Sequence, residues 1–338
     1  MAEFFDHLEM RFFIVIFFLA VAFELHAQQR SDIAKLSDDA KTIVAIIEEE
    51  DMVPSDTMGL RSGYLPKDYP LTLLRQKLTI DELVYLTNHK NPVVRSYAFK
   101  ALTMMNEPAA FDILKDHLQD TIKVSTYYGC FRSDEYVGDF FVSAYRGREA
   151  VSHDSIHLNL LDSLLIFTPN KLRSRDHAIR NAAQRGKYYN RIRDFVVNEK
   201  LGAGIIALAH FKNPDDVDII METAPSGGAL FEDHPLGTTL FAISLFPDPG
   251  FLPFLEHHLP SMMTRPPDLE CRFLYRAISN YNNKKAKDLL SQPLQIPDRA
   301  LRVEHLEALS EVLKKNSHPV YDDLRRRLKE EAGTSGQR

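Results

Sequence analysis

A pattern that recurs at an interval of 35 residues constrains the fold of this chain more than any other feature. Each clear copy has an alanine, an aromatic residue four positions later, an Asn or Asp two positions after that, and an apolar pair near its end. Self-similarity at such a period is typical of repeat proteins, whose neighbouring units stack on one another. The clearest copies begin at Ala207, Ala242 and Ala277, and looser ones begin at Ala101 and Ala308.

Each copy predicts the end of one helix and the start of the next. Asn and Asp side chains accept hydrogen bonds from the free amides at a helix N-terminus, and proline is favoured at the first helical position. Asn213 precedes Pro214, Asp248 precedes Pro249, and Pro108 stands at the same place in the early copy. Such helix pairs cannot bury their apolar sides alone, so we expect an all-α fold, an α-solenoid of stacked helix pairs.

Residues 91 to 102 resemble the second helix of a HEAT repeat, a unit of a known family of helical-repeat proteins. In that family an amide or acid and an arginine form a structural ladder between repeats. Asn91 and Arg95 occupy those positions, and Asp298 and Arg302 repeat them. The resemblance implies an armadillo/HEAT-like superhelix, and as a whole the chain is similar to uncharacterised exported HEAT-repeat proteins.

The N-terminal segment is typical of a signal peptide. Residues 12 to 23 form an unbroken apolar run, shorter than the roughly 20 residues that a membrane-spanning helix needs. Met10 is the better start codon, because only Arg11 then precedes the run, whereas the residues before it are acidic. Cleavage after Ala27 would release a chain without a stable membrane span into the periplasm or the medium, and an uncleaved anchor is the alternative.

The mature chain divides into several segments. After the signal peptide, residues 1–27, we expect an N-terminal capping helix and loop over 28–65 and the repeats over 66–328, followed by a flexible tail at 329–338. Within the repeats, residues from about 120 to 150 do not follow the pattern. Between residues 127 and 145, seven aromatic residues and two glycines gather, which predicts a small hairpin or irregular aromatic insert.

Two groups of residues are candidates for binding a partner. The aromatic residues of the insert would supply rigid contact area, although they could instead pin the insert onto the repeats. The stretch 171–193 holds eight basic residues and one acid, and its Arg173 and Arg180 share a helix face. This face would attract an anionic ligand or an acidic partner, or would be a solvated surface. The partner-binding candidates are Tyr127, Tyr128, Phe131, Arg173 and Arg180.

Signals for an enzyme or a metal site are few. His153 and His157 are four residues apart, with Asp154 between them, and would face the same way on a helix, but no third ligand stands at a telling distance. Cys130 is the one candidate nucleophile, and with Cys271 it is either bridged or free. The glycines at 202 and 204 are a poor match to a dinucleotide fingerprint, because no strand pattern precedes them.

Together these patterns predict a non-catalytic protein-interaction scaffold. It would be an exported monomer without a cofactor, and it would present a curved helical-repeat surface to a protein or to an anionic cell-envelope partner. A net charge of −6 and export both argue against nucleic acid. The alternatives are an enzyme or metal-binding protein that uses His153, Asp154 and His157, or Cys130, and a structural envelope protein without a discrete ligand.

Overall fold

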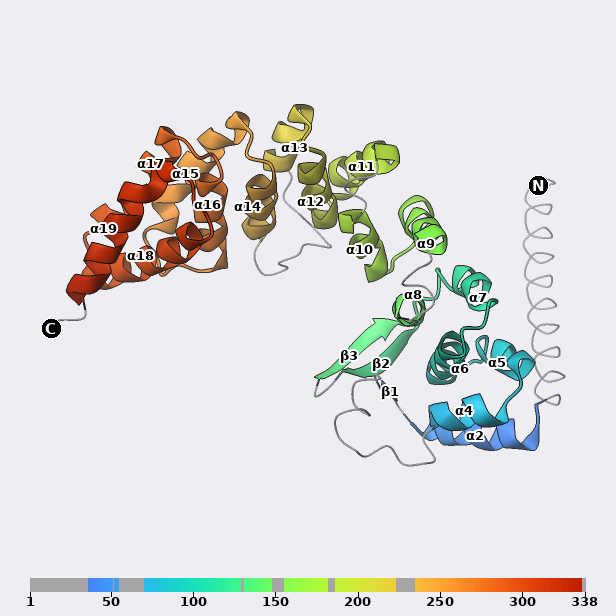
Figure 1. Ribbon diagram of the computed structural model, residues 1–338. Coiled ribbons are helices and arrows are strands. Elements are labelled where there is room, and N and C mark those ends of the chain that lie inside the picture. The colour runs from blue at the N-terminus through green and yellow to red at the C-terminus, as the bar shows by residue number, and fades with distance from the viewer. Residues whose placement is uncertain are drawn as a thin grey trace, which may run out of the picture. The chain divides into compact units, whose positions relative to one another are not determined.

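The computed structural model describes residues 36–50, 52–54, 70–128, 131–147, 155–181, 186–222 and 235–335. These residues are mostly helical, in agreement with the expected all-α class, and their strands form a single small sheet (Figure 1). The chain divides into two compact units, residues 1–158 and 159–338. None of the helices in the described ranges is long and apolar enough to cross a membrane. The predicted signal peptide, residues 1–27, lies outside the described residues.

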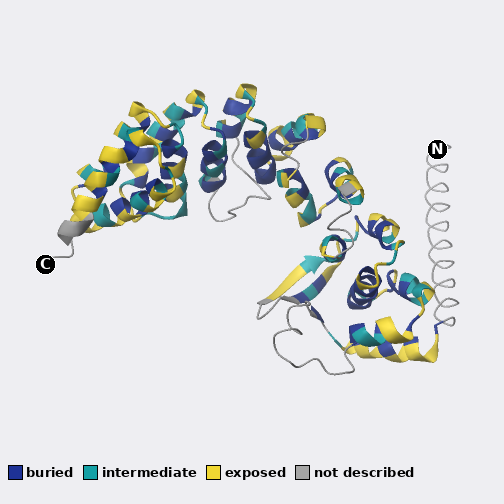
Figure 2. Ribbon diagram, viewed as in Figure 1, coloured by how far each residue is buried: buried dark blue, intermediate teal, exposed yellow. Residues whose placement is uncertain are grey.

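In the first unit the helices gather around α6, which has most of its length buried (Figure 2). Its Phe99 ring stacks on Phe141 of α8 at a centroid distance of 3.9 Å. Asn91 caps α6 by accepting a hydrogen bond from the amide of Val93 at 2.8 Å. The helices of this unit are α2 (Asp38–Glu49), α4 (Pro70–Lys77), α5 (Ile80–Leu86), α6 (Pro92–Met104), α7 (Ala110–Asp116) and α8 (Val137–Arg146).

The small sheet has the order β1-β2-β3. Strands β2 (Lys123–Tyr128) and β3 (Phe131–Tyr136) form an antiparallel hairpin in which Lys123 is opposite Tyr136, and β1 (Val53–Pro54) runs parallel to β2. The stretch Val137–Arg146 of the expected insert is not irregular, because it forms helix α8. Residues at four-residue spacing along α8, Val137, Phe141 and Tyr145, are buried, so packing against α6 favours a helix there.

The second unit is a series of helix pairs. The even-numbered helices from α10 to α18 contact one another in chain order, and each odd-numbered helix from α11 to α19 packs beside an even-numbered one (Figure 1). Helix α19 continues beyond residue 328, where the repeats were expected to end. The helices are α9 (Ser155–Phe167, which crosses the unit border), α10 (Arg173–Asn181), α11 (Tyr189–Glu199), α12 (Gly202–Phe211), α13 (Val217–Glu222), α14 (Pro235–Leu245), α15 (Leu252–Met262), α16 (Leu269–Ser279), α17 (Lys284–Leu290), α18 (Arg299–Lys314) and α19 (Asp322–Ser335).

The recurring residues have equivalent places in these pairs. Ala207, Ala242 and Ala277 are completely buried in α12, α14 and α16, where a small side chain allows close helix packing. Asn213 and Asp248 cap short 3-10 helices, η4 (Pro214–Asp216) and η5 (Pro249–Phe251), that lead into α13 and α15. The side-chain oxygen of Asp248, for example, accepts from the Gly250 amide at 2.8 Å.

Hydrogen bonds also join the turns of successive pairs. The side-chain amide of Asn280 donates to the carbonyl of Ser244 at 2.6 Å, and that of Asn316 donates to the carbonyl of Ser279 at 2.8 Å. The Tyr321 hydroxyl donates to the same Ser279 carbonyl at 2.9 Å. These bonds connect residues 36, 37 and 42 positions apart, so the ends of α14 and α16 are each held by the next pair along the chain.

Candidate binding groove between helices α16 and α18

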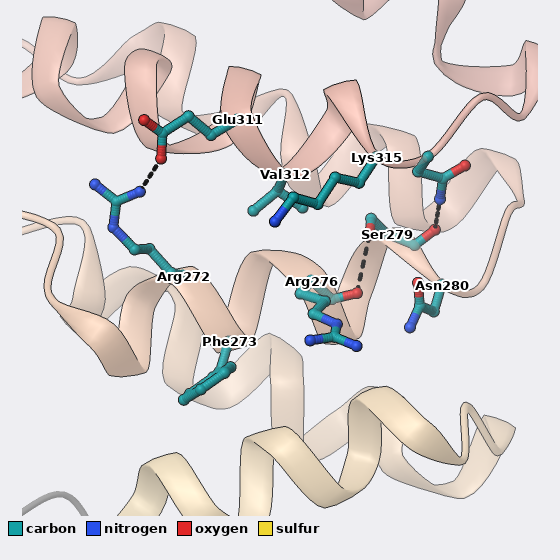
Figure 3. A pocket seen from close by; sticks show the side chains of 9 residues that line it. Arg272, Phe273, Arg276, Ser279, Asn280, Glu311, Val312 and Lys315 are labelled. Carbon is teal, nitrogen blue, oxygen red and sulfur yellow. Dashed lines mark hydrogen bonds and ion pairs between the residues drawn. The ribbon is translucent and has the colours of Figure 1, made fainter. Parts of the chain in front are cut away.

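A groove of about 510 Å³ lies between α16 and α18 in the second unit (Figure 3). Helix α16 begins at the N-cap Asp268, and its Leu274, Tyr275 and Ile278 are buried, which leaves the opposite side of the helix toward the groove. Helix α18 begins at the N-cap Asp298 and likewise buries one face. The groove is lined by Arg272, Phe273, Arg276, Ser279, Asn280, Glu311, Val312, Lys315 and Asn316.

The charged side chains of the groove differ from one helical turn to the next. Arg272 on α16 forms an ion pair with Glu311 on α18 across the groove (Figure 3). Four residues later in the chain, Arg276 on α16 and Lys315, the C-cap of α18, line the same groove, and both are exposed. Neither forms an ion pair with a described residue. The groove therefore carries two positive charges that the described part of the chain does not neutralise.

Aromatic rings extend this surface to α14. The Phe273 ring meets Phe241 edge to face, with a centroid distance of 5.4 Å. The guanidinium of Arg276 lies 5.5 Å from the centroid of Phe241, within the range of a cation–π interaction. This contact places the arginine side chain beside an aromatic ring.

A buried polar chain lies on the other side of α16. His305 Nε2 is 2.8 Å from the carbonyl of Arg265, which can only accept, so this nitrogen carries the proton. The Tyr275 hydroxyl, 2.7 Å from His305 Nδ1, therefore donates to it. Burial lowers the pKa of His305 and raises the pKa of the Cys271 thiol to about 11. Because the thiol stays protonated at neutral pH, Cys271 has the properties of a structural residue and not of a nucleophile.

The basic stretch 171–193 is partly occupied by internal contacts. Arg175 pairs with Glu199 at 3.2 Å and lies over the Phe195 ring at 5.2 Å. Arg193 pairs with the buried Asp216 at 3.1 Å. Arg173 is exposed on α10 and Arg180 is half-buried there, so the structure places both candidates on one helix but not in the groove.

The aromatic and metal candidates are only partly described. Tyr127, Tyr128 and Phe131 lie at the closed end of the hairpin, where Tyr128 pairs with Phe131, and their side chains lie outside the described residues, as does Cys130. The same holds for His153 and Asp154. The His157 ring stacks on Phe111 at 4.6 Å, and its Nδ1 is 3.2 Å from the Tyr145 hydroxyl. Among the described residues, three potential metal ligands nowhere gather into a site.

The two arginines singled out by the HEAT resemblance make matching contacts. The Arg95 guanidinium donates to the carbonyl of His89 at 2.7 Å, and that of Arg302 donates to the carbonyl of Ile296 at 2.8 Å. In both cases the acceptor is six residues earlier in the chain. Arg95 also forms an ion pair with Asp120 at 3.0 Å. These arginines hold the turn in front of their own helix.

Sequence reasoning missed the groove. The four-residue spacings of Arg272 with Arg276 and of Glu311 with Lys315 were present as a signal, because residues four apart share a helix face. They carried no information about which turn of α18 lies opposite which turn of α16.

Comparison with known proteins does not add a family to this description. No family model, no curated protein and no solved structure matches the chain. Any assignment of function therefore depends on the contacts of this chain itself.

Proposed function

We propose that the protein is a non-catalytic interaction scaffold, an α-solenoid of HEAT-like helix pairs that binds a protein or anionic cell-envelope partner. The observation that carries the proposal is the groove between α16 and α18, where Arg276 and Lys315 add two positive charges beside Phe273. Arginine and aromatic side chains contribute most of the binding free energy in many protein interfaces.

The solenoid part of the proposal is supported by equivalent contacts in different copies. The turn-to-turn bonds of Asn280 and Asn316 repeat after one helix pair, and Arg95 and Arg302 hold their turns in the same way. A stack of this kind presents an extended surface that is formed by packed helices. Preorganised anchors bind more tightly, because less conformational entropy is lost.

Export remains part of the proposal, since the apolar run at 12–23 is typical of a signal peptide. N-terminal sequencing of the protein isolated from its own cells tests it. We expect the mature chain to begin at Gln28, whereas a chain that still begins at Met1 or Met10 would contradict cleavage.

The interaction itself is tested by site-specific photo-crosslinking in cells that express the full chain. A photoreactive amino acid replaces Val312, which lines the groove and whose replacement leaves both cations in place, and a control replaces Lys284, an exposed lysine at the start of α17 outside the groove. We expect a discrete crosslinked partner from position 312 and not from position 284. Identical products at both positions, or none at position 312, would refute the groove as the binding surface.

A further inference from the structure

The facing turns of α16 and α18 show how the groove can recognise a ligand. Their first pair, Arg272 and Glu311, is complementary, with a carboxylate bound to a guanidinium. In the next turn of both helices, Arg276 and Lys315 line the groove instead, so a carboxylate is replaced by a second cation. The lysine has no acidic partner among the described residues, and the arginine contacts the ring of Phe241.

Arg276 and Lys315 bring two positive charges to one groove, and a carboxylate bound there would be attracted by both. Guanidinium and ammonium groups form short, charge-assisted hydrogen bonds to carboxylates. The carboxylate of Glu311 forms such a bond to Arg272 one turn away, within the same groove. A carboxylate supplied by a partner would therefore form a second pair of opposite charges, one turn further along the two helices.

The apolar side chains of the groove indicate which group of the ligand should lie next to that carboxylate. Phe273 and Val312 line the groove between the charged turns, and the ring of Phe241 extends the apolar surface to α14. A ligand that is only charged would leave these side chains in contact with water. An apolar or aromatic group next to the carboxylate would bury them and add to the binding free energy.

We propose that the groove between α16 and α18 binds an acidic peptide segment of a protein partner. An Asp or Glu carboxylate of the segment lies between Arg276 and Lys315, and a neighbouring apolar or aromatic side chain packs on Phe273. This inference rests on the proposed scaffold function and specifies the chemistry of its partner.

The composition of the groove favours a peptide over an extended polyanion. A membrane surface or a nucleic acid is bound by wide faces of many cations, because each phosphate contact adds to the affinity. Here the charge of Arg272 is neutralised by Glu311, and a volume of about 510 Å³ accommodates a few side chains.

Fluorescence anisotropy with the full chain and a fluorescein-labelled hexapeptide of three Phe-Glu repeats tests the proposal. The matched probe has three Phe-Gln repeats, which remove the carboxylates alone. We expect the acidic probe to bind at least about tenfold more tightly, and Arg276→Gln or Lys315→Gln to weaken it by about tenfold, the effect of losing one charge-assisted hydrogen bond. Lys284→Gln removes the same charge outside the groove and should leave binding unchanged.

A variant that should bind the acidic probe more tightly distinguishes an effect on binding from a loss of folding. Glu311→Gln releases Arg272 from its ion pair and adds a second place for a carboxylate. We expect this variant to bind the acidic probe severalfold more tightly than the wild type. An unchanged or weakened affinity would contradict the proposal that the basic side chains of the groove bind carboxylates.

Four results would overturn the proposal. Equal binding of the Phe-Glu and Phe-Gln probes would exclude carboxylate recognition, and an equal loss for Lys284→Gln would indicate unspecific attraction. Binding to phosphatidylglycerol vesicles that displaces the acidic probe and is lost in Arg276→Gln would identify a membrane ligand instead. If the acidic probe does not bind while position 312 still crosslinks to a discrete partner, the scaffold function stands and this inference fails.

Discussion

Replacing Gly204 by alanine tests how closely α11 and α12 pack. A Cβ at this position would lie 2.6 Å from Cγ2 of Val196 and 3.5 Å from the carbonyl oxygen of Ile192. Carbon atoms in contact are separated by about 3.5 to 4.0 Å, so the valine methyl would have to move by about 1 Å. Val196 is completely buried in α11 and has little space for such a movement.

The expected magnitude is the balance of two effects. Alanine stabilises a helix interior by about 1 kcal/mol relative to glycine. Overpacking a dense core costs about 1 to 3 kcal/mol, so Gly204→Ala should lower the free energy of unfolding by about 1 kcal/mol. Gly186→Ala is the matched control, because nothing lies within 4 Å of its added Cβ, and this variant should be at least as stable as the wild type.

Urea denaturation followed by circular dichroism measures these differences. The double variant Gly204→Ala/Val196→Ala should recover part of the loss compared with the sum of the two single variants, because removing the valine methyl groups makes room for the new Cβ. If Gly204→Ala is as stable as Gly186→Ala, or if the double variant shows no coupling, the close packing of α11 on α12 is refuted.

Three further predictions concern a helix end, a buried histidine and a buried thiol. Lys212 has a positive φ of 54° at the C-terminus of α12, so Lys212→Gly should raise the free energy of unfolding by about 1 kcal/mol in urea. Because burial lowers the pKa of His305 below 6.5, its neutral form stabilises the fold at and above this pH, and stability should fall as the pH drops below 6.5. His305→Gln should weaken this dependence in denaturation series at several pH values, and an unchanged slope would contradict the assignment. In a Cys130→Ser background, Cys271 should react with iodoacetamide much faster in urea than in the folded chain, because burial raises its pKa to about 11.

Much of the local structure was predictable, because its causes are local. Asn213 and Asp248 satisfy amides only two residues away, and each is followed by a proline whose geometry starts a helical turn. Spaced alanines such as Ala242 and Ala277 indicated where helices approach one another, and both are completely buried. The predominance of helices followed from the same patterns.

Other elements could not be read in the same way. The stretch from Val137 to Arg146 has a β-rich composition, and Phe140 and Phe141 favoured a hairpin or irregular structure. It is helical because Phe141 stacks on Phe99 of α6. Intrinsic β propensity is a weak preference of about 1 kcal/mol across the whole scale, so burial against another element overrides it.

The sequence by itself determined the caps, the helix pairs and the residues on each helix face, since these depend on spacings of two to four residues. The tertiary structure decided which faces meet. Arg276 and Lys315 are 39 residues apart, and they line one groove because α18 packs beside α16 with Glu311 opposite Arg272. That register follows from the fit of buried side chains across the interface, a property of both helices together that no spacing within either one contains.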